Sequence, residues 1–281
     1  MEIVLFMGAD ERTKDIPNML YGTAWKEDAT ENLVCAAIEA GFRGIDTANQ
    51  RCHYNEEAVG SAISRMLGSG TKREEFFIQT KYTFAGGQDH RMPYDIREDY
   101  RTQVKQSFQS SLDHLQVDYI DSYLLHGPST RYGLTQDDWQ VWQEMEAIHE
   151  EGRITHLGVS NISIEQLKIL FEGAKVNPSF VQNRCFAKQG WDRDVRGFCK
   201  DNGIVYQGFS LLTANPFVLP EVERIAGKAN KTPAQVLLRF SAHIGILPLT
   251  GTTSRIHMKE DLALDFDLEH EDIQFIENIA G

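Results

Sequence analysis

The sequence is poor in cysteine, and its cysteines lack the spacings that build metal sites or disulfide frameworks. Only four are present, Cys35, Cys52, Cys185 and Cys199, with no Cys-x-x-Cys and no paired Cys/His pattern. Scattered thiols of this kind are typical of reduced cysteines in a cytoplasmic protein. We therefore expect no metal site.

Long apolar runs are absent as well. No stretch approaches the roughly 20 residues that a membrane-spanning helix needs. The start of the chain, Met1–Phe6, is apolar, but it contains Glu2 and is followed by Asp10 and Glu11, which is the wrong polarity for a secretory signal. We expect a cytoplasmic protein that does not bind membranes.

Positive charge is scarce relative to negative charge. The chain carries 28 basic and 41 acidic residues, a formal net charge of -13. Nucleic acids and anionic membranes reward clustered Lys and Arg, so neither is expected as a partner. An anionic ligand must instead find a local positive pocket. The sequence does not indicate an oligomeric state.

What is present is an alternation of β-rich and helical segments over an ordinary, 41% hydrophobic composition. The expected strands are 19–25, 42–48, 76–82, 119–126, 154–160, 180–185, 204–211 and 245–249. The expected helices are 32–40, 58–67, 100–115, 139–149, 164–171, 193–200, 234–240 and 269–279. Eight strand-helix units in 281 residues predict an α/β fold, a single-domain (β/α)8 TIM barrel over residues 1–281. Residues 1–18 are expected to form a small plug or hairpin at the opposite end of the barrel.

Chemistry-bearing residues collect at the ends of these strands, where parallel α/β proteins place their sites. They are Asp46, Lys81, His126 and the pair Ser160–Asn161. A buried Asp and Lys are expensive unless they pair, and neighbouring strands would allow it. For each residue taken alone, the simpler interpretation is structural: an ion pair between Asp and Lys, or a histidine whose hydrogen bonds are made within the protein. Two long loops after the third and fourth strands, 83–95 and 127–137, are either pocket walls or solvated loops.

Taken in order, several motifs over nearly the whole chain resemble the aldo-keto reductase family. They are GFRGIDTA at 41–48, NE at 55–56, VG at 59–60, TK at 80–81, VDYID at 117–121, LLH at 124–126, GRI at 152–154, GVSN at 158–161, VQ at 181–182 and TPAQVLLR at 232–239. The resemblance implies a (β/α)8 barrel that binds a nicotinamide cofactor across the strand ends. It also implies an NADP(H)-dependent oxidoreductase that reduces aldehydes or ketones, with a small-molecule carbonyl compound as its partner.

The family's catalytic tetrad of Asp, Tyr, Lys and His maps onto Asp46, Tyr54, Lys81 and His126. Tyrosine protonates the carbonyl oxygen as hydride arrives. A free phenol has a pKa of about 10, so an ammonium at Lys81 would favour phenolate and ease proton release. Asp46 would hold Lys81, and His126 would orient the carbonyl oxygen.

The turn that should carry the tyrosine departs from the family pattern. Asn55 lies nine positions after Asp46 instead of seven. Counting forward from Asp46 reaches Arg51, and counting back from Asn55 reaches His53. Tyr54 is the only tyrosine in the turn and is favoured as the acid, with His53 as the rival. A third possibility is that this turn only leads into the next helix, and that the protein is a catalytically weak relative of the family.

The resemblance also implies a set of cofactor-binding residues. At the nicotinamide end and along the strand ends they are Thr23, Ser160, Asn161, Gln182, Phe209, Ser210 and Leu212. Asn161 is equally compatible with capping the next helix. At the phosphate end, Leu249 replaces the usual lysine, and the expected contacts are Gly251, Thr252, Thr253, Arg255 and Glu260 or Asp261. NADP is favoured, and NAD is possible.

Aromatic residues near strand ends are candidates for a substrate pocket, with packing as the simpler alternative for about half of them. Trp25 and Tyr82 are the main candidates, with Phe84 and Trp191 as further ones. Two other functions stay open. One is a cofactor-binding regulatory or interaction protein with weak or no turnover, and the other is an aldolase-like barrel that uses Lys81 for a Schiff base.

Overall fold

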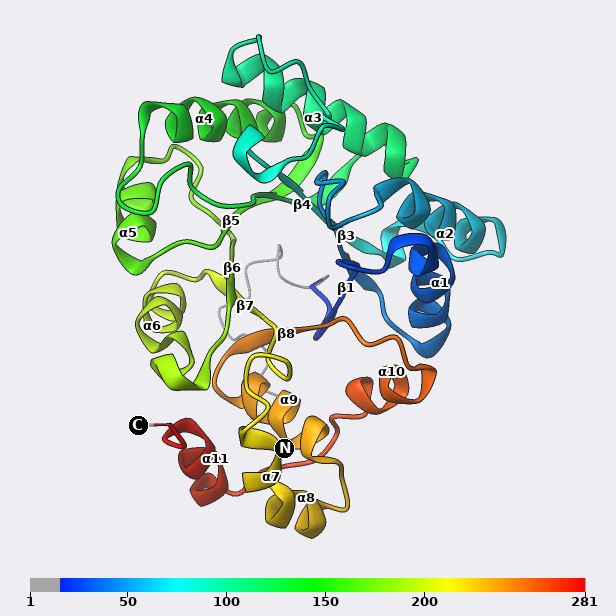
Figure 1. Ribbon diagram of the computed structural model, residues 1–281, viewed down its shortest axis with the longest axis vertical. Helices are drawn as coiled ribbons and strands as arrows, with labels where there is room; N and C mark the ends of the chain where they lie inside the picture. The colour runs from blue at the N-terminus through cyan, green and yellow to red at the C-terminus, as the bar shows by residue number, and fades with distance from the viewer. Residues whose placement is uncertain (1–15, 281) are drawn as a thin grey trace.

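Eight parallel strands close into a barrel in the computed structural model, which describes residues 16–280. Each strand pairs with the next in chain order, and β8 pairs back to β1. Figure 1 shows the strands at the centre with helices arranged around them. The strands are β1 (Leu20–Gly22), β2 (Gly44–Asp46), β3 (Phe77–Tyr82), β4 (Ile120–Leu125), β5 (Ile154–Ser160), β6 (Phe180–Arg184), β7 (Val205–Phe209) and β8 (Ile246–Thr250). The predicted (β/α)8 fold is confirmed. Most of the plug expected at residues 1–18 falls outside the described residues.

Helices follow the strands where the apolar periodicity predicts them. They are α1 (Thr30–Ala40), α2 (Glu56–Gly68), α3 (Tyr100–Leu115), α4 (Gln136–Glu150), α5 (Ile164–Gly173), α6 (Arg193–Asp201), α7 (Val218–Glu221), α8 (Glu223–Ala229), α9 (Pro233–His243), α10 (Arg255–Leu262) and α11 (His270–Glu277). Helices α7, α8 and α10 are not among the predicted helix ranges. Helices α7 and α8 have only 4 and 7 residues and show little periodicity.

Side-chain caps fix where several helices begin. Ser163 and Thr232 form capping boxes with the third residues of α5 and α9. Asn55 caps α2 by accepting a hydrogen bond from the backbone nitrogen of Ala58, at 3.1 Å. The cap on α2 matters most, because the helix begins directly after it and Tyr54 is left in the preceding turn.

The interior of the barrel changes from apolar to polar along the strands. An apolar cluster fills one end and consists of Leu20, Phe77, Phe180, Val205, Leu247 and Leu249. Two residues further along their strands lie the buried amides of Gln79, Gln182 and Gln207. Alternate residues of a strand share a face, so Lys81 continues the inward series of β3. The barrel is therefore closed by packing at one end and lined by polar groups toward the carboxyl ends of its strands.

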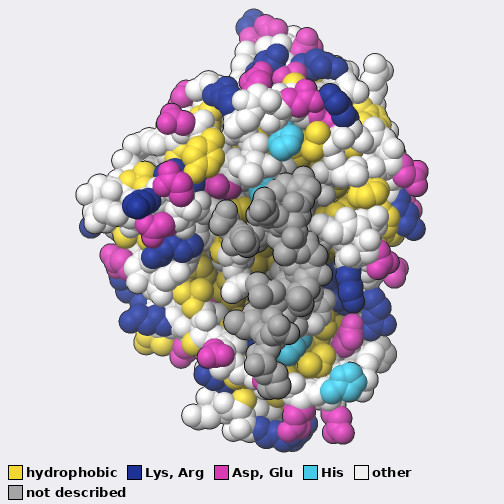
Figure 2. Space-filling view, turned by 180° about the vertical axis from the view of Figure 1, so that it is seen from behind, with side chains coloured by type: hydrophobic (Ala, Val, Ile, Leu, Met, Phe, Trp, Pro, Cys, Tyr) yellow, Lys and Arg dark blue, Asp and Glu magenta, His cyan; other side chains and the backbone are white. Residues whose placement is uncertain are grey.

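The surface carries charges of both signs. In the view of Figure 2, acidic and basic side chains are interspersed over the visible face. Among residues 16–280, no helix combines the length and the apolar character that crossing a membrane requires.

Candidate active site

Asp46 and Lys81 form a buried ion pair at the carboxyl ends of β2 and β3. The Lys81 ammonium lies 2.7 Å from Asp46 Oδ1 and 2.7 Å from the carbonyl oxygen of Thr47. The side chain of Lys81 is 0% exposed and that of Asp46 is 4% exposed. Burial lowers the pKa of Lys81, and the Asp46 carboxylate acts in the opposite direction. A buried pair is stable only when further hydrogen bonds support it. The amides of Gln79 and Gln182 provide them, donating to the same carboxylate oxygen at 2.7 and 3.0 Å.

His126 follows the last residue of β4 and faces the same mouth. Its Nδ1 lies 2.7 Å from the hydroxyl of Thr83, so Nε2 is the ring nitrogen left for another partner. Burial, and secondarily the charge of Lys81, lowers the pKa of His126 to about 3. The imidazole is therefore neutral at physiological pH.

Tyr54 stands beside both groups. Its ring centroid lies 5.4 Å from the Lys81 ammonium and 6.0 Å from the centroid of His126, with the two rings edge to face at 68°. Within residues 16–280 its hydroxyl has no hydrogen-bond partner. The longer path after Asp46 is taken up by a compact turn, in which the backbone nitrogens of His53 and Tyr54 both donate to the Gln50 carbonyl at 3.1 and 3.0 Å.

The two rival residues of this turn point elsewhere. His53 packs against Trp25, with ring centroids 4.0 Å apart and the rings tilted at 43°, and its Nδ1 contacts the amide oxygen of Gln50 at 2.8 Å. Arg51 forms an ion pair with Glu57. Of the three candidates, only Tyr54 has a ring contact with Lys81 and His126.

The protonation of Tyr54 differs from the expectation that Lys81 would favour phenolate. Burial is the largest influence on the Tyr54 phenol and raises its pKa, and the Asp46 carboxylate acts in the same direction. The phenol is therefore protonated at neutral pH. This is the form that a proton donor requires.

Ser160, Asn161 and Gln182 lie together at the ends of β5 and β6. The Ser160 hydroxyl donates to the Gln182 carbonyl at 2.7 Å. Asn161 does not cap a helix, because Ser163 caps α5. Instead the Asn161 amide nitrogen donates to the His126 carbonyl at 2.8 Å, which ties the ends of β4 and β5 together.

The mouth is rich in left-handed backbone. Non-glycine residues with positive φ follow three of the strands, namely Trp25 (61°), Asn161 (53°) and Ser210 (57°). Such residues cost on the order of 1 kcal/mol or more each and cluster at functional sites. Ser210 directly follows Phe209, whose ring lies 5.5 Å from the Arg184 guanidinium at the end of β6.

The other residues expected on the cofactor side lie at the ends of β1, β7 and β8. Thr23 is buried, and its hydroxyl donates to the Asp46 carbonyl at 3.0 Å, so its contact is with the end of β2. Leu212 lies partly buried in the turn after β7 and packs against the core. Gly251 and Thr253 are exposed in the loop that leads to α10. Thr252 receives a hydrogen bond from the backbone nitrogen of Ser254, at 3.2 Å.

Two predicted phosphate-end residues have protein partners instead. Arg255 begins α10 but is 67% exposed at its side chain and pairs with Glu39 at 2.8 Å. Asp261 is buried and accepts a hydrogen bond from the Thr250 hydroxyl at 2.6 Å. Burial raises the pKa of Asp261. Neither side chain is free in this structure, and Asp261 in particular has a structural role at the end of β8.

The structure places one further cation at this mouth, Lys26. It is 7% exposed, and its ammonium donates to the carbonyl oxygen of Gly251 at 2.6 Å, 5.2 Å above the ring of Tyr21. Burial lowers its pKa to about 8. No carboxylate within residues 16–280 pairs with it. In the sequence, Lys26 is indistinguishable from a solvated lysine. The one usable signal was its position just after the first strand, which neighbours the last strand in a closed barrel.

Comparison with known proteins agrees with this geometry. The model of the aldo/keto reductase family matches residues 18–219. The chain belongs to the aldo-keto reductase family. It is 33% identical to a glyoxal reductase of Bacillus subtilis over 253 residues, covering 89% of this chain and 83% of the relative. It is 30% identical to a 9,11-endoperoxide prostaglandin H2 reductase of Trypanosoma cruzi over 276 residues, covering 94% of this chain and 88% of the relative.

Solved aldo-keto reductases share the fold. One from a Medee basin deep-sea metagenome library superposes with a TM-score of 0.81 at 28% identity, covering 96% of this chain and 94% of its own. One from Brucella melitensis superposes with a TM-score of 0.78 at 30% identity, covering 94% of this chain and 95% of its own. The protein is thus an oxidoreductase that acts on small-molecule carbonyl compounds with a nicotinamide cofactor, NAD(P)H.

Not every aromatic residue expected in the substrate pocket of this aldo-keto reductase reaches the mouth. Tyr82 is completely buried outside the barrel, because its neighbour Lys81 points inward and successive strand residues alternate. The Tyr82 ring stacks on Tyr94, with centroids 5.6 Å apart. Trp191 is also fully buried and donates to the Ile276 carbonyl at 3.1 Å. Trp25 is 70% exposed, and its ring packs against His53.

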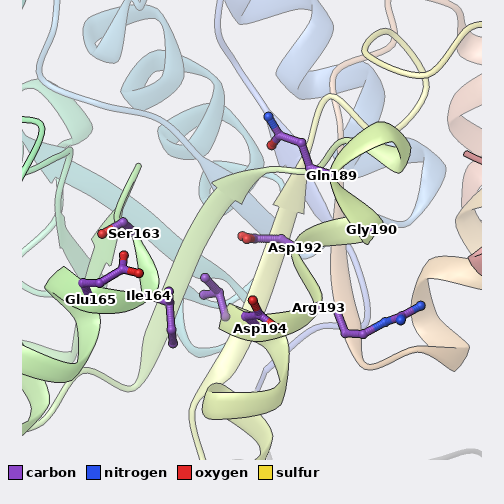
Figure 3. A pocket seen from close by; sticks show the side chains of 9 residues that line it. Ser163, Ile164, Glu165, Gln189, Gly190, Asp192, Arg193 and Asp194 are labelled. Atoms are coloured by element: carbon purple, nitrogen blue, oxygen red, sulfur yellow. The ribbon is translucent and has the colours of Figure 1, made fainter. Parts of the chain in front are cut away.

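Two hollows lie on the reductase outside the group formed by Asp46, Tyr54, Lys81 and His126, and neither contains these residues. One of about 390 Å³ lies between the starts of α5 and α6, where Figure 3 shows Ser163, Glu165, Asp192 and Arg193 around it. The other, of about 420 Å³, lies between the two long loops and is lined by Phe84, Ile96, Ser129 and Thr135, among others. The second agrees with the expectation that these loops shape a pocket, and it brings Phe84 to its wall.

Proposed function

We propose that this protein reduces aldehydes or ketones to alcohols with NADP(H), and that Tyr54 supplies the proton. The observation that carries the proposal is the position of Tyr54. Its hydroxyl is without a partner among the described residues, and its ring contacts both the Lys81 ammonium and His126. This combination of a protonated phenol, a buried cation and a neutral imidazole suits proton transfer to a carbonyl oxygen.

The residues at the mouth fit a nicotinamide cofactor, which supplies the hydride when it is bound. Both amide hydrogens of Gln182 are used, since Nε2 donates to Asp46 at 3.0 Å and to Gln207 at 2.9 Å. The side-chain oxygen of Gln182, Oε1, therefore remains for the N–H donors of the nicotinamide carboxamide. Ser160 and Asn161 would assist from β5. Phe209 offers a flat apolar face to the ring, and Ser210, Leu212 and Thr23 would flank the rest of the cofactor at the strand ends.

A phosphate-binding end lies between β1 and β8. The Lys26 ammonium has only a carbonyl oxygen as hydrogen-bond partner among the described residues, so an anionic ligand would complete its environment. Gly251, Thr252 and Thr253 lead into the start of α10, where backbone amides and hydroxyls favour phosphate. Arg255, freed from Glu39, would contact the 2′-phosphate, which is the basis for preferring NADP to NAD.

Each residue of the tetrad would have one role in the reaction. Tyr54 donates its proton to the carbonyl oxygen. His126, with its proton on Nε2 and Thr83 donating to Nδ1, hydrogen-bonds the same oxygen and orients it. Lys81 stabilises the phenolate that Tyr54 becomes, and Asp46 holds Lys81 in place. His126 stays neutral throughout, because its pKa is about 3.

A Schiff-base aldolase is not supported as an alternative. Lys81 is completely buried and bonded to Asp46 and the Thr47 carbonyl, so its nitrogen is not accessible to a substrate. A cofactor-binding regulatory protein remains a distinct outcome of the experiment below.

The test is NADPH oxidation by the purified protein with a panel of simple aromatic aldehydes, ketones and small dicarbonyl compounds. The dicarbonyls are included because one relative is named glyoxal reductase. Turnover that depends on the carbonyl compound supports the proposal. Tight NADPH binding without turnover over the whole panel would instead favour the regulatory function.

A further inference from the structure

Three glutamine side chains occupy the interior of the barrel directly beneath the Asp46–Lys81 pair. Gln79 comes from β3, Gln182 from β6 and Gln207 from β7, and all three are at most 3% exposed. Barrel interiors are usually filled by branched apolar side chains. A buried amide without hydrogen bonds costs about 1–3 kcal/mol, so a layer of amides needs a reason to persist there.

Gln79 and Gln207 form a reciprocal amide pair. Gln79 Nε2 donates to Gln207 Oε1 at 2.8 Å, and Gln207 Nε2 donates to Gln79 Oε1 at 2.9 Å. The Ser122 hydroxyl of β4 also donates to Gln79 Oε1, at 2.8 Å. With its second hydrogen donated to Asp46 Oδ1 at 2.7 Å, the Gln79 amide uses its full hydrogen-bonding capacity.

The network also fixes which way the Gln79 amide faces. Two donors converge on its oxygen, so its nitrogen is the end that must face Asp46. The opposite orientation would set a carbonyl oxygen against the carboxylate and leave the Ser122 hydroxyl without its acceptor. Gln79 therefore presents the positive end of a fixed dipole to Asp46, from inside the barrel.

We propose that Gln79 is a positioning residue that acts through Asp46: it holds the Asp46 carboxylate in the alignment that places the Lys81 ammonium beside Tyr54. Gln182 also donates to Asp46, but it lies at the cofactor side. The Gln79 amide is fully occupied by Asp46, Gln207 and Ser122, so its contact with Asp46 does not depend on the cofactor. The inference rests on the proposed function, because it assigns Gln79 a role in the reaction of Tyr54.

The sign of the effect follows from electrostatics. Replacing Gln79 by methionine, which has a similar length and no N–H, removes positive potential from the cluster. Asp46 would then take up a proton more readily, and the Tyr54 phenol would release its proton less readily. Both ionisations move to higher pH.

The experiment compares Gln79→Met and Gln207→Met with the matched control Gln235→Met. Gln235 is likewise buried and hydrogen-bonded, but it caps α9, and it touches none of the tetrad. The readout is the pH profile of kcat for alcohol oxidation, which rises as Tyr54 loses its proton. Gln79→Met should move the rising limb upward by about one pH unit, Gln207→Met by less, and Gln235→Met should lower Tm without moving the profile.

Two further measurements keep the proposal separate from the proposed function. If the wild-type protein shows no turnover, the proposed function fails, and the carboxyl carbon of Asp46 is then followed by NMR as the pH is lowered. Protonation of Asp46 at a higher pH in Gln79→Met than in the wild type supports the role of Gln79. If Gln79→Met does not fold, Ser122→Ala is the milder variant and should shift the same readouts in the same direction. Profiles and Asp46 titrations that coincide with the wild type would overturn the proposal.

Discussion

The ammonium group of Lys26 lies 2.6 Å from the carbonyl oxygen of Gly251, and this contact joins the end of β1 to the loop after β8. The lysine is almost fully buried, and no carboxylate of the described chain neutralises it. A buried cation with an incomplete shell is expensive in an empty site and favourable beside an anion. Its position therefore suits a phosphate shared by NAD and NADP, whereas the exposed Arg255 suits the 2′-phosphate.

Replacing Lys26 by methionine should weaken the binding of both NADPH and NADH about tenfold or more. The reason is that a hydrogen bond to a charged group contributes about 1.5–3 kcal/mol. Arg255→Met is the matched control. It should weaken the binding of NADPH and leave the binding of NADH unchanged. The quenching of protein fluorescence gives the dissociation constants of both cofactors for each variant. Equal affinities for wild type and Lys26→Met would show that Lys26 has only a structural contact with Gly251.

Cofactor affinity should also depend on pH through Lys26. Its pKa in the free protein is about 8, so the ammonium is present at pH 7 and is largely lost at pH 9. NADPH binding is therefore expected to weaken between these values, and the weakening should be absent in Lys26→Met. A titration series over this range measures it. Parallel pH dependences in the two proteins would contradict the assignment.

His126 should make the fold sensitive to acid. Its pKa is about 3 in the folded protein against 6.5 ordinarily, so between these values the unfolded chain binds a proton that the folded chain does not. Stability conferred by the neutral ring is present above pH 6.5 and is lost as the pH falls, by up to about 1.4 kcal/mol per pH unit. Urea unfolding from pH 7 to pH 5 should show a steeper loss in the wild type than in His126→Gln. Equal slopes would mean that His126 is solvated and titrates normally.

Gly60 should be essential for packing α2 against α3. A Cβ at this position would lie 2.0 Å from the carbonyl oxygen of His114. Gly60→Ala is therefore expected to destabilise the protein by about 1–3 kcal/mol or more, with Tm falling by about 2–4 °C per kcal/mol. By contrast, a Cβ added to Gly197 in α6 would meet no other part of the described chain within 4 Å, so Gly197→Ala should stabilise by about 0.5–1 kcal/mol. Thermal unfolding of both variants distinguishes a specific close approach from a general intolerance to alanine.

Some parts of the site follow from strand periodicity, and others do not. Lys81 was expected at a strand end, paired with Asp46. Because it points into the barrel, strand alternation places Tyr82 outside and Gln79 inside. Expecting Tyr82 in the substrate pocket overlooked this rule. Gln79 lies two residues before Lys81, so its direction was predictable, but its bonds to Gln207 and Ser122 depend on distant strands.

Irregular backbone limited the predictions most. The first strand was expected to reach Trp25 but ends at Gly22, because Trp25 adopts a left-handed conformation with φ of 61°. The turn from Gln50 to Tyr54 has no periodicity, and its shape depends on hydrogen bonds to one carbonyl oxygen. Counting residues reached Arg51 and His53, whereas Tyr54 was favoured as the only tyrosine of the turn. The contact of Tyr54 with Lys81 and His126 could not be read from the spacing.

The most direct test of the account is single-turnover reduction of an aromatic aldehyde by Tyr54→Phe and His53→Asn, each preloaded with NADPH. The phenylalanine variant keeps the ring that contacts Lys81 and His126 but lacks the hydroxyl. We expect it to bind NADPH like the wild type and to lose about 10²–10⁴-fold in rate, whereas His53→Asn keeps most of its activity. A wild-type rate in Tyr54→Phe, or a selective loss in His53→Asn, would contradict the assignment of Tyr54 as the proton donor.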